Sequence, residues 1–129
     1  MSAALRLHIG FRLMEIALKV LVVLHFIGLA SLLGGFLVQM STSPKVVNNA
    51  MFHGVLTQLV TGVLLVGVLE SMKEPGETLN MAKITTKLVV LLVITALVVA
   101  NRKKESVSTG IWAAIGLLTI ANVVIAVFW

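Results

Sequence analysis

Two side chains that could do chemistry, those of His25 and Lys87, lie inside long apolar stretches of the sequence. An ionisable side chain at the centre of a membrane helix costs about 2.5–3.5 kcal/mol on the insertion scale, so such residues are usually retained for a function. Imidazole is a common ligand of haem iron and of other metals. His25 is therefore the candidate metal ligand, and His25 and Lys87 are the candidate cofactor-binding residues. A structural histidine that donates one hydrogen bond to a neighbouring carbonyl explains the same pattern.

The residues around His25 repeat at helical spacing and include two glycines. Spacings of three, four and seven residues place one stripe of a helix on the same side. Glycines let helix backbones approach closely, and they leave room for a flat macrocycle beside an imidazole. The stripe is therefore predicted to face the inside of a helix bundle. Its members are His25, Gly28, Leu32, Gly35, Phe36 and Gln39.

His53 is the other histidine inside an apolar stretch. Counted from the centres of their spans, His25 and His53 differ in depth by about 10 Å at 1.5 Å per residue, so they are not expected to ligate one haem iron. Met40, Met51 and His53 lie toward one membrane face, and thioethers with an imidazole suit Cu(I). Methionine at a helix end more often serves packing, so copper is the weaker alternative.

Four charged residues lie toward the face from which His25 enters the membrane. Pairing of Glu70 with Lys87 and of Glu15 with Lys19 would satisfy all four charges, and we predict this arrangement. The alternative is a proton- or carboxylate-handling cluster beside His25. The sequence has no cysteine, no tyrosine and no aspartate, and it contains no Ser-His-Asp, HExxH or glycine-rich phosphate motif. We therefore expect no self-sufficient hydrolase or transferase.

Four apolar stretches must position these residues. They cover residues 16–40, 46–69, 84–100 and 111–129, and 59% of the chain is hydrophobic. A helix of about 20 residues crosses a hydrocarbon core of about 30 Å. Because the connections are short, consecutive helices should be antiparallel. The sequence thus predicts an all-α integral membrane protein, a single membrane domain of residues 1–129 folded as an up-down-up-down bundle of four transmembrane helices.

The ends of the helices carry further signals. Residues 1–15 are predicted to extend the first helix along the membrane interface. Trp112 and Trp129 are expected in the two aromatic belts, and Asn122 is expected to hydrogen-bond to a neighbouring helix. The N-terminal caps predicted for the second, third and fourth helices are Ser43 (followed by Pro44), Thr78, and Ser106 or Ser108, respectively.

The charge distribution bears on partners and orientation. The net charge is +5, but the basic residues lie at helix ends and in short connections, which is typical of contacts with lipid headgroups and not with nucleic acid. The first apolar stretch is too long for a cleaved signal peptide, so this helix should remain. A slight excess of Lys and Arg on the N-terminal side favours cytoplasmic termini. We expect a multi-pass protein of the bacterial cytoplasmic (inner) membrane that contacts the lipid bilayer and other membrane protein subunits.

Two segments resemble a known group of proteins. ALKVLVVLHFIGLASLLGGFL, with its lysine, LHxxG and Gly-Gly pair, is similar to the first helix of small bacterial membrane proteins related to copper-resistance CopD and to the HemJ-type protoporphyrinogen oxidase. KITTKLVVLLVITALVVANRKK resembles their third helix. The resemblance implies that haem b is bound by the first-helix histidine, His25, and that the third-helix lysine, Lys87, is required. The continuation FLVQMSTSPK differs from those enzymes, so the oxidase activity does not carry over.

Two functions therefore remain open. The first is a non-catalytic small integral membrane subunit that packs within a larger bacterial membrane complex, for example a respiratory one, with His25 as a buried structural residue. The alternative is a b-type haem-binding membrane protein of the HemJ/CopD-like type, with an electron-transfer or porphyrin-related role. The absorption spectrum of the purified chain distinguishes them, because only the second is coloured.

Overall fold

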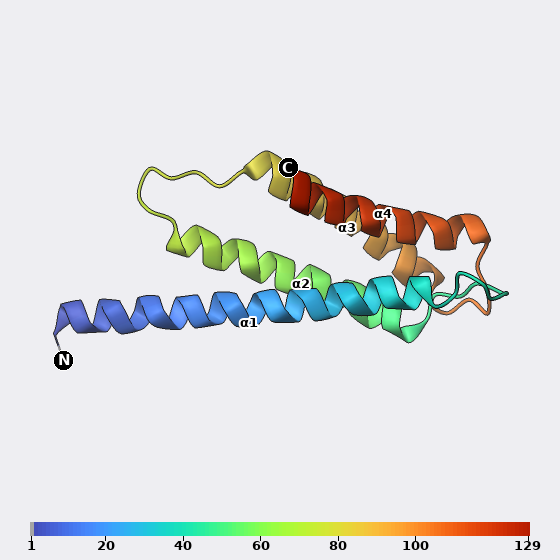
Figure 1. Ribbon diagram of the computed structural model, residues 1–129, viewed down its shortest axis with the longest axis horizontal. Coiled ribbons are helices and arrows are strands. Elements are labelled where there is room, and N and C mark those ends of the chain that lie inside the picture. Colours follow the sequence, from blue (N-terminus) through green and yellow to red (C-terminus); the bar gives the residue numbers. More distant parts are fainter. Residues whose placement is uncertain (1) are drawn as a thin grey trace.

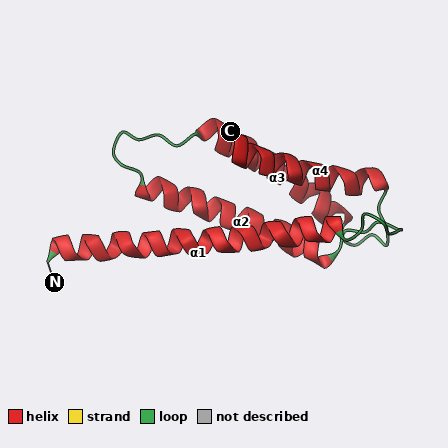
Figure 2. Cartoon of the chain, viewed as in Figure 1, coloured by secondary structure: helices red, strands yellow, loops and turns green. Residues whose placement is uncertain are grey.

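The computed structural model describes residues 2–129 and confirms an all-α bundle of four helices (Figure 1). The helices are α1 (Ala3–Leu37), α2 (Asn49–Met72), α3 (Met81–Asn101) and α4 (Thr109–Phe128). All four are long and apolar enough to cross a membrane, so the chain is a multi-pass membrane protein. Within the described residues, the nearest approach to a strand is an isolated bridge between Lys45 and Val107; the rest of the connections are loops and turns (Figure 2).

The chain runs up and down, and the helices pack around a ring in which α1 contacts α2 and α4, and α3 contacts the same two helices. We call the end that holds connections 38–48 and 102–108 the closed end. The opposite end, with the N-terminus, connection 73–80 and the C-terminus, is the open end (Figure 1). The buried residues of each helix lie between the closed end and about the middle of that helix. The packed core therefore occupies one half of the bundle, which we call the closed half.

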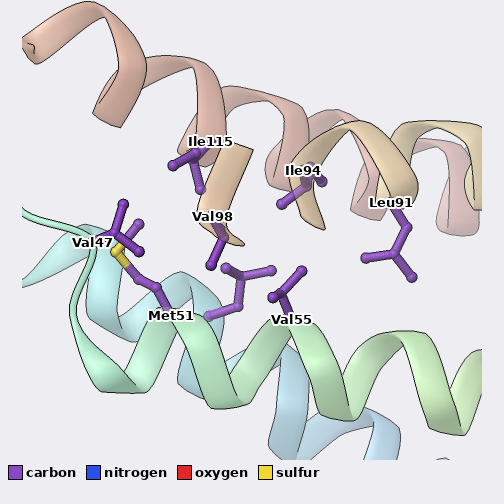
Figure 3. Packing of buried hydrophobic residues seen from close by; sticks show 8 residues of the cluster. Val47, Met51, Val55, Leu91, Ile94, Val98 and Ile115 are labelled. Carbon is purple, nitrogen blue, oxygen red and sulfur yellow. The ribbon is translucent and has the colours of Figure 1, made fainter. Parts of the chain in front are cut away.

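The core is built by facing apolar side chains of all four helices. Figure 3 shows Met51 and Val55 of α2 facing Val98, Ile94 and Leu91 of α3. Side chains such as Met51 and Val55 are fully buried, which is the state that stabilises a packed interior. The complete cluster is Leu32, Val47, Met51, Val55, Leu91, Ile94, Val98 and Ile115.

Close approach of α1 and α2 depends on glycine, as the sequence predicts. A Cβ atom on Gly54 would overlap the backbone nitrogen of Leu32, and one on Gly28 would lie 2.9 Å from the Thr57 side chain. A Cβ on Gly35 would lie 2.6 Å from the amide oxygen of the Asn48 side chain. Close backbone contact of this kind is the way helices associate in lipid, where apolar burial gives little driving force.

Helix α1 is far longer than the others. Its 35 residues extend about 52 Å, against about 30 Å for the 20 residues of α4. The helix begins at Ala3, capped by the Ser2 side chain, and its first turns project beyond the other helices at the open end (Figure 1). The predicted extension of the first helix is thus helical from residue 3, but it continues the axis of the membrane span and does not turn along the interface.

Two of the predicted caps are wrong and one is confirmed. Asn48, not Ser43, caps α2, because its side-chain oxygen accepts from the Met51 amide at 2.9 Å. Asn80, not Thr78, caps α3, and Ser108 caps α4 as predicted. The second helix starts later than expected because residues 38–48 form a compact loop.

Candidate functional site

The His25 ring lies between α1 and α2 and is held by a hydroxyl group. Its Nδ1 is 2.7 Å from the Thr61 hydroxyl oxygen, and that hydroxyl donates to the Thr57 carbonyl at 2.5 Å. Because a threonine hydroxyl has one hydrogen, its oxygen must accept from His25, so Nδ1 carries the ring proton. None of the hydrogen bonds of residues 2–129 uses Nε2. Its lone pair is thereby left free, and a neutral imidazole ligates metals through such a nitrogen.

The surroundings of His25 are provided by α2. Its backbone carbonyl accepts a hydrogen bond from the Gln58 amide, and the Cβ position of Gly62 is 3.5 Å from the ring Cε1. The ring is half-buried. A Cβ atom at position 62 would make ordinary van der Waals contact with the ring. The stripe that carries His25 faces α2, as predicted, and the residue that accepts its hydrogen bond is Thr61 and not a carbonyl.

Lys87 lies on α3, nearly two turns from the open end, and is also half-buried. Within residues 2–129 the structure gives its ammonium group no salt bridge or hydrogen bond. The predicted pair with Glu70 is wrong: Glu70 is bridged to Lys73 at 3.0 Å, one turn further along the chain. The predicted pair of Glu15 with Lys19 is not formed either, because no contact within 4.0 Å joins their charged groups.

Lys87 lies on α3 on the open-end side of the packed core, and His25 contacts Thr61 at the middle of α2, at the edge of that core. Lys83, one turn nearer the open end, donates to the Ala126 carbonyl at 3.1 Å. The helices α3 and α4 are antiparallel. Lys87 lies four residues from Lys83, and Asn122 lies four residues from Ala126, both toward the closed end, so Lys87 and Asn122 are at the same level of the bundle.

Asn122 adds an unsatisfied polar atom at this level. Its side-chain oxygen is buried without a hydrogen-bond partner among the described residues, so the predicted bond to a neighbouring helix is absent. A buried acceptor without a partner costs about 1–3 kcal/mol. His25, Lys87 and Asn122 thus present a free lone pair, an unpaired cation and an unpaired oxygen on three different helices.

A second polar cluster, at the closed end, was not predicted from the sequence. Lys45 is 8% exposed, and its ammonium donates to the carbonyls of Gln39 and of Thr42, the latter at 2.7 Å. It also lies 4.3 Å from the centre of the Trp112 ring. This lysine satisfies the carbonyls that follow the end of α1. The one indication of this cluster in the sequence was Gln39, which lies on the stripe predicted to face the inside of the bundle.

Trp112 and His53 also differ from their expected surroundings. Trp112 is buried, stacks on Phe36 with ring centroids 4.4 Å apart, and donates to the Phe36 carbonyl, so its ring packs against α1 inside the bundle. His53 is exposed, and eight residues, about 12 Å of helix, separate it from Thr61. Met51 is fully buried and points away from His53, because positions i and i+2 do not share a helix face. The three copper ligands considered above are not brought together.

Comparisons with protein-family models, with curated proteins and with solved structures find no match to this chain. What the geometry establishes is a four-helix integral membrane protein with a satisfied polar cluster at its closed end. The half nearer the open end, which we call the open half, holds polar groups without partners among residues 2–129.

Proposed function

We propose that this chain is a non-catalytic integral membrane subunit that binds haem b between α1 and α3. The observation that carries the proposal is the free Nε2 of His25 at the edge of the packed core, together with the unpaired ammonium of Lys87 on α3. One atom is a ligand for iron, and the other is a cation without a counter-charge inside a membrane span. A ligand that supplies a metal and a carboxylate together would satisfy both.

His25 and Lys87 have the donor chemistry that haem b requires, an imidazole nitrogen for the iron and a cation for a propionate. His25 would ligate the iron through Nε2, because Thr61 fixes the tautomer and the ring orientation, as the hydrogen-bond partners of metal-ligating histidines usually do. Lys87 would pair with a propionate. Bound haem would supply one-electron redox chemistry. The resemblance of the first and third helices to CopD- and HemJ-like proteins supports the same two residues.

The subunit role is supported by the projecting part of α1. Leu5, Ile9 and Leu13 form one stripe on it and are each more than 40% exposed. This part is continuous with the membrane span and projects past the other helices, so no other helix of the chain covers the stripe. We propose that another subunit of a complex in the bacterial cytoplasmic membrane, for example a respiratory one, binds there, with both termini of the chain in the cytoplasm.

The absorption spectrum of the chain, purified in detergent from haem-replete cells, tests the haem proposal. We expect a Soret band and α/β bands that sharpen on reduction with dithionite. His25→Ala should remove most of the bound haem, and Lys87→Met should weaken haem binding about tenfold, the equivalent of one charge-assisted contact. His53→Ala is the matched control and should leave the spectrum unchanged.

A colourless chain that also fails to take up added haemin would overturn the haem proposal. Loss of the bands in His53→Ala, with retention in His25→Ala, would overturn the assignment of the ligand. The subunit role is tested separately by purification in mild detergent. Ile9→Glu should release a co-purifying membrane protein while the absorption spectrum stays the same. A wild-type chain that purifies alone from native membranes would overturn the subunit role.

A further inference from the structure

A shallow pocket lies between the projecting part of α1 and the end of α2, away from His25 and Lys87. Its walls combine apolar and charged residues from two segments of the chain. Leu7, Phe11 and Met14 of α1 and Met72 of α2 form the apolar side. Arg6 of α1, with Lys73 and Glu74 after α2, forms the charged side.

The charges of the pocket are only partly paired. Lys73 is bridged to Glu70 at 3.0 Å. Within residues 2–129 the side chains of Arg6 and Glu74 have no ion pair, and none of the hydrogen bonds of this part of the chain uses their charged groups. The pocket therefore presents one free guanidinium and one free carboxylate, more than 4.0 Å apart. A ligand with one anionic and one cationic group complements both.

The depth of the pocket matches the boundary between hydrocarbon and headgroups. The 24 residues of α2 extend about 36 Å, which exceeds a hydrocarbon core of about 30 Å. The contact between His25 and Thr61 sets the register of the antiparallel pair α1 and α2. Met14 is as many residues from His25 as Met72 is from Thr61, in both cases toward the open end. The apolar side of the pocket therefore lies level with the end of α2.

We propose that this pocket binds a phospholipid with a zwitterionic, primary-amine headgroup, of the phosphatidylethanolamine type. The phosphate pairs with Arg6, the ammonium donates to Glu74, and the upper part of an acyl chain lies along Phe11 and Met14. Charge-assisted hydrogen bonds of this kind are the strong ones. Phosphatidylglycerol has no ammonium for Glu74, and the quaternary amine of phosphatidylcholine has no N–H to donate.

Gly10 gives a way to close the pocket without disturbing the fold. It lines the pocket, and a Cβ atom added to it would meet nothing within 4 Å. Leucine is also a better helix former than glycine. Gly10→Leu should therefore keep the helix and fill the space that the lipid needs.

Native mass spectrometry of the detergent-purified chain tests the proposal by titration with short-chain phosphatidylethanolamine, phosphatidylglycerol and phosphatidylcholine. We expect phosphatidylethanolamine to bind about tenfold more tightly than either of the others, the equivalent of one lost contact. Arg6→Gln, Glu74→Gln and Gly10→Leu should each weaken its binding about tenfold or more. Arg12→Gln, which changes an exposed arginine outside the pocket, is the matched control and should have no effect.

Equal binding of the three lipids would overturn the proposal, as would unchanged affinity in Gly10→Leu. Tighter binding of phosphatidylglycerol, insensitive to Glu74→Gln, would mean a simple anion site at Arg6 and would also overturn it. Helicity measured by circular dichroism on each variant separates loss of the site from loss of the fold.

Discussion

The closed end and the open half of this bundle each keep a lysine away from water, and they treat its charge differently. Lys45 is surrounded by carbonyl oxygens and by the face of Trp112, so its charge is satisfied by the chain itself. Lys87 has no such partners among the described residues. Residues that a fold leaves unsatisfied are the ones expected to serve function, whereas satisfied polar clusters serve structure.

Packing follows the same division. In the closed half, glycines bring α1 and α2 into backbone contact, and Gly116 of α4 leaves room for the Phe36 ring. In the open half, Gly67 and Gly10 have nothing within 4 Å of their Cβ positions. One half is therefore a fixed scaffold. In the other half, the Cβ positions of Gly67 and Gly10 do not face a neighbouring helix.

The largest expected change in unfolding free energy comes from placing a large side chain at the contact between α1 and α2, and it tests whether the two halves differ in packing. Gly54→Leu should lower the free energy of unfolding by about 3 kcal/mol, because the new side chain meets the backbone of Leu32 and not a movable side chain. Gly67→Leu, on the same helix in the open half, should be neutral or slightly stabilising. Helicity loss during titration with SDS measures both. Equal costs for the two variants would show that the halves do not differ in packing.

Much of the fold could be predicted from sequence, but the division into two halves could not, and the reasons for the failures are specific. Apolar length alone identified four membrane helices, and the glycine spacing around His25 identified the face of α1 that packs inside the bundle. The pair of Glu70 with Lys87 failed because Lys73, three residues from Glu70, competes locally. The burial of Lys45 was missed because sequence periodicity carries no information about a loop that folds back on the end of a helix.

The second prediction compares the two lysines directly. Lys45→Met should cost about 2 kcal/mol of unfolding free energy, because it leaves carbonyl oxygens in the closed end without a donor. Lys87→Met should cost nothing or stabilise the chain, because it removes an unpaired charge from a membrane span. The same SDS titration, made on haem-free protein, measures both. A large loss in Lys87→Met would reveal a structural partner for that ammonium group.

A double-mutant cycle gives the control for this pair. Lys87→Met combined with Glu70→Gln should equal the sum of the single changes to within about 0.5 kcal/mol, since Glu70 is engaged with Lys73. Recovery of stability in the double mutant would instead restore the pairing predicted from the sequence.

The smallest effect concerns two asparagines whose side-chain oxygens are both buried without partners among the described residues. Asn101, at the closed end, still donates to the Leu97 carbonyl at 2.7 Å, so Asn101→Leu loses one hydrogen bond and relieves one unsatisfied oxygen. Its net effect should be close to zero. Within residues 2–129 no hydrogen bond offsets the buried oxygen of Asn122, so Asn122→Leu should stabilise the haem-free chain by about 1 kcal/mol. If Asn122→Leu instead destabilises it, while Asn101→Leu does not, the Asn122 oxygen must have a partner in the membrane, and Lys87 would remain as the unpaired polar group of the open half.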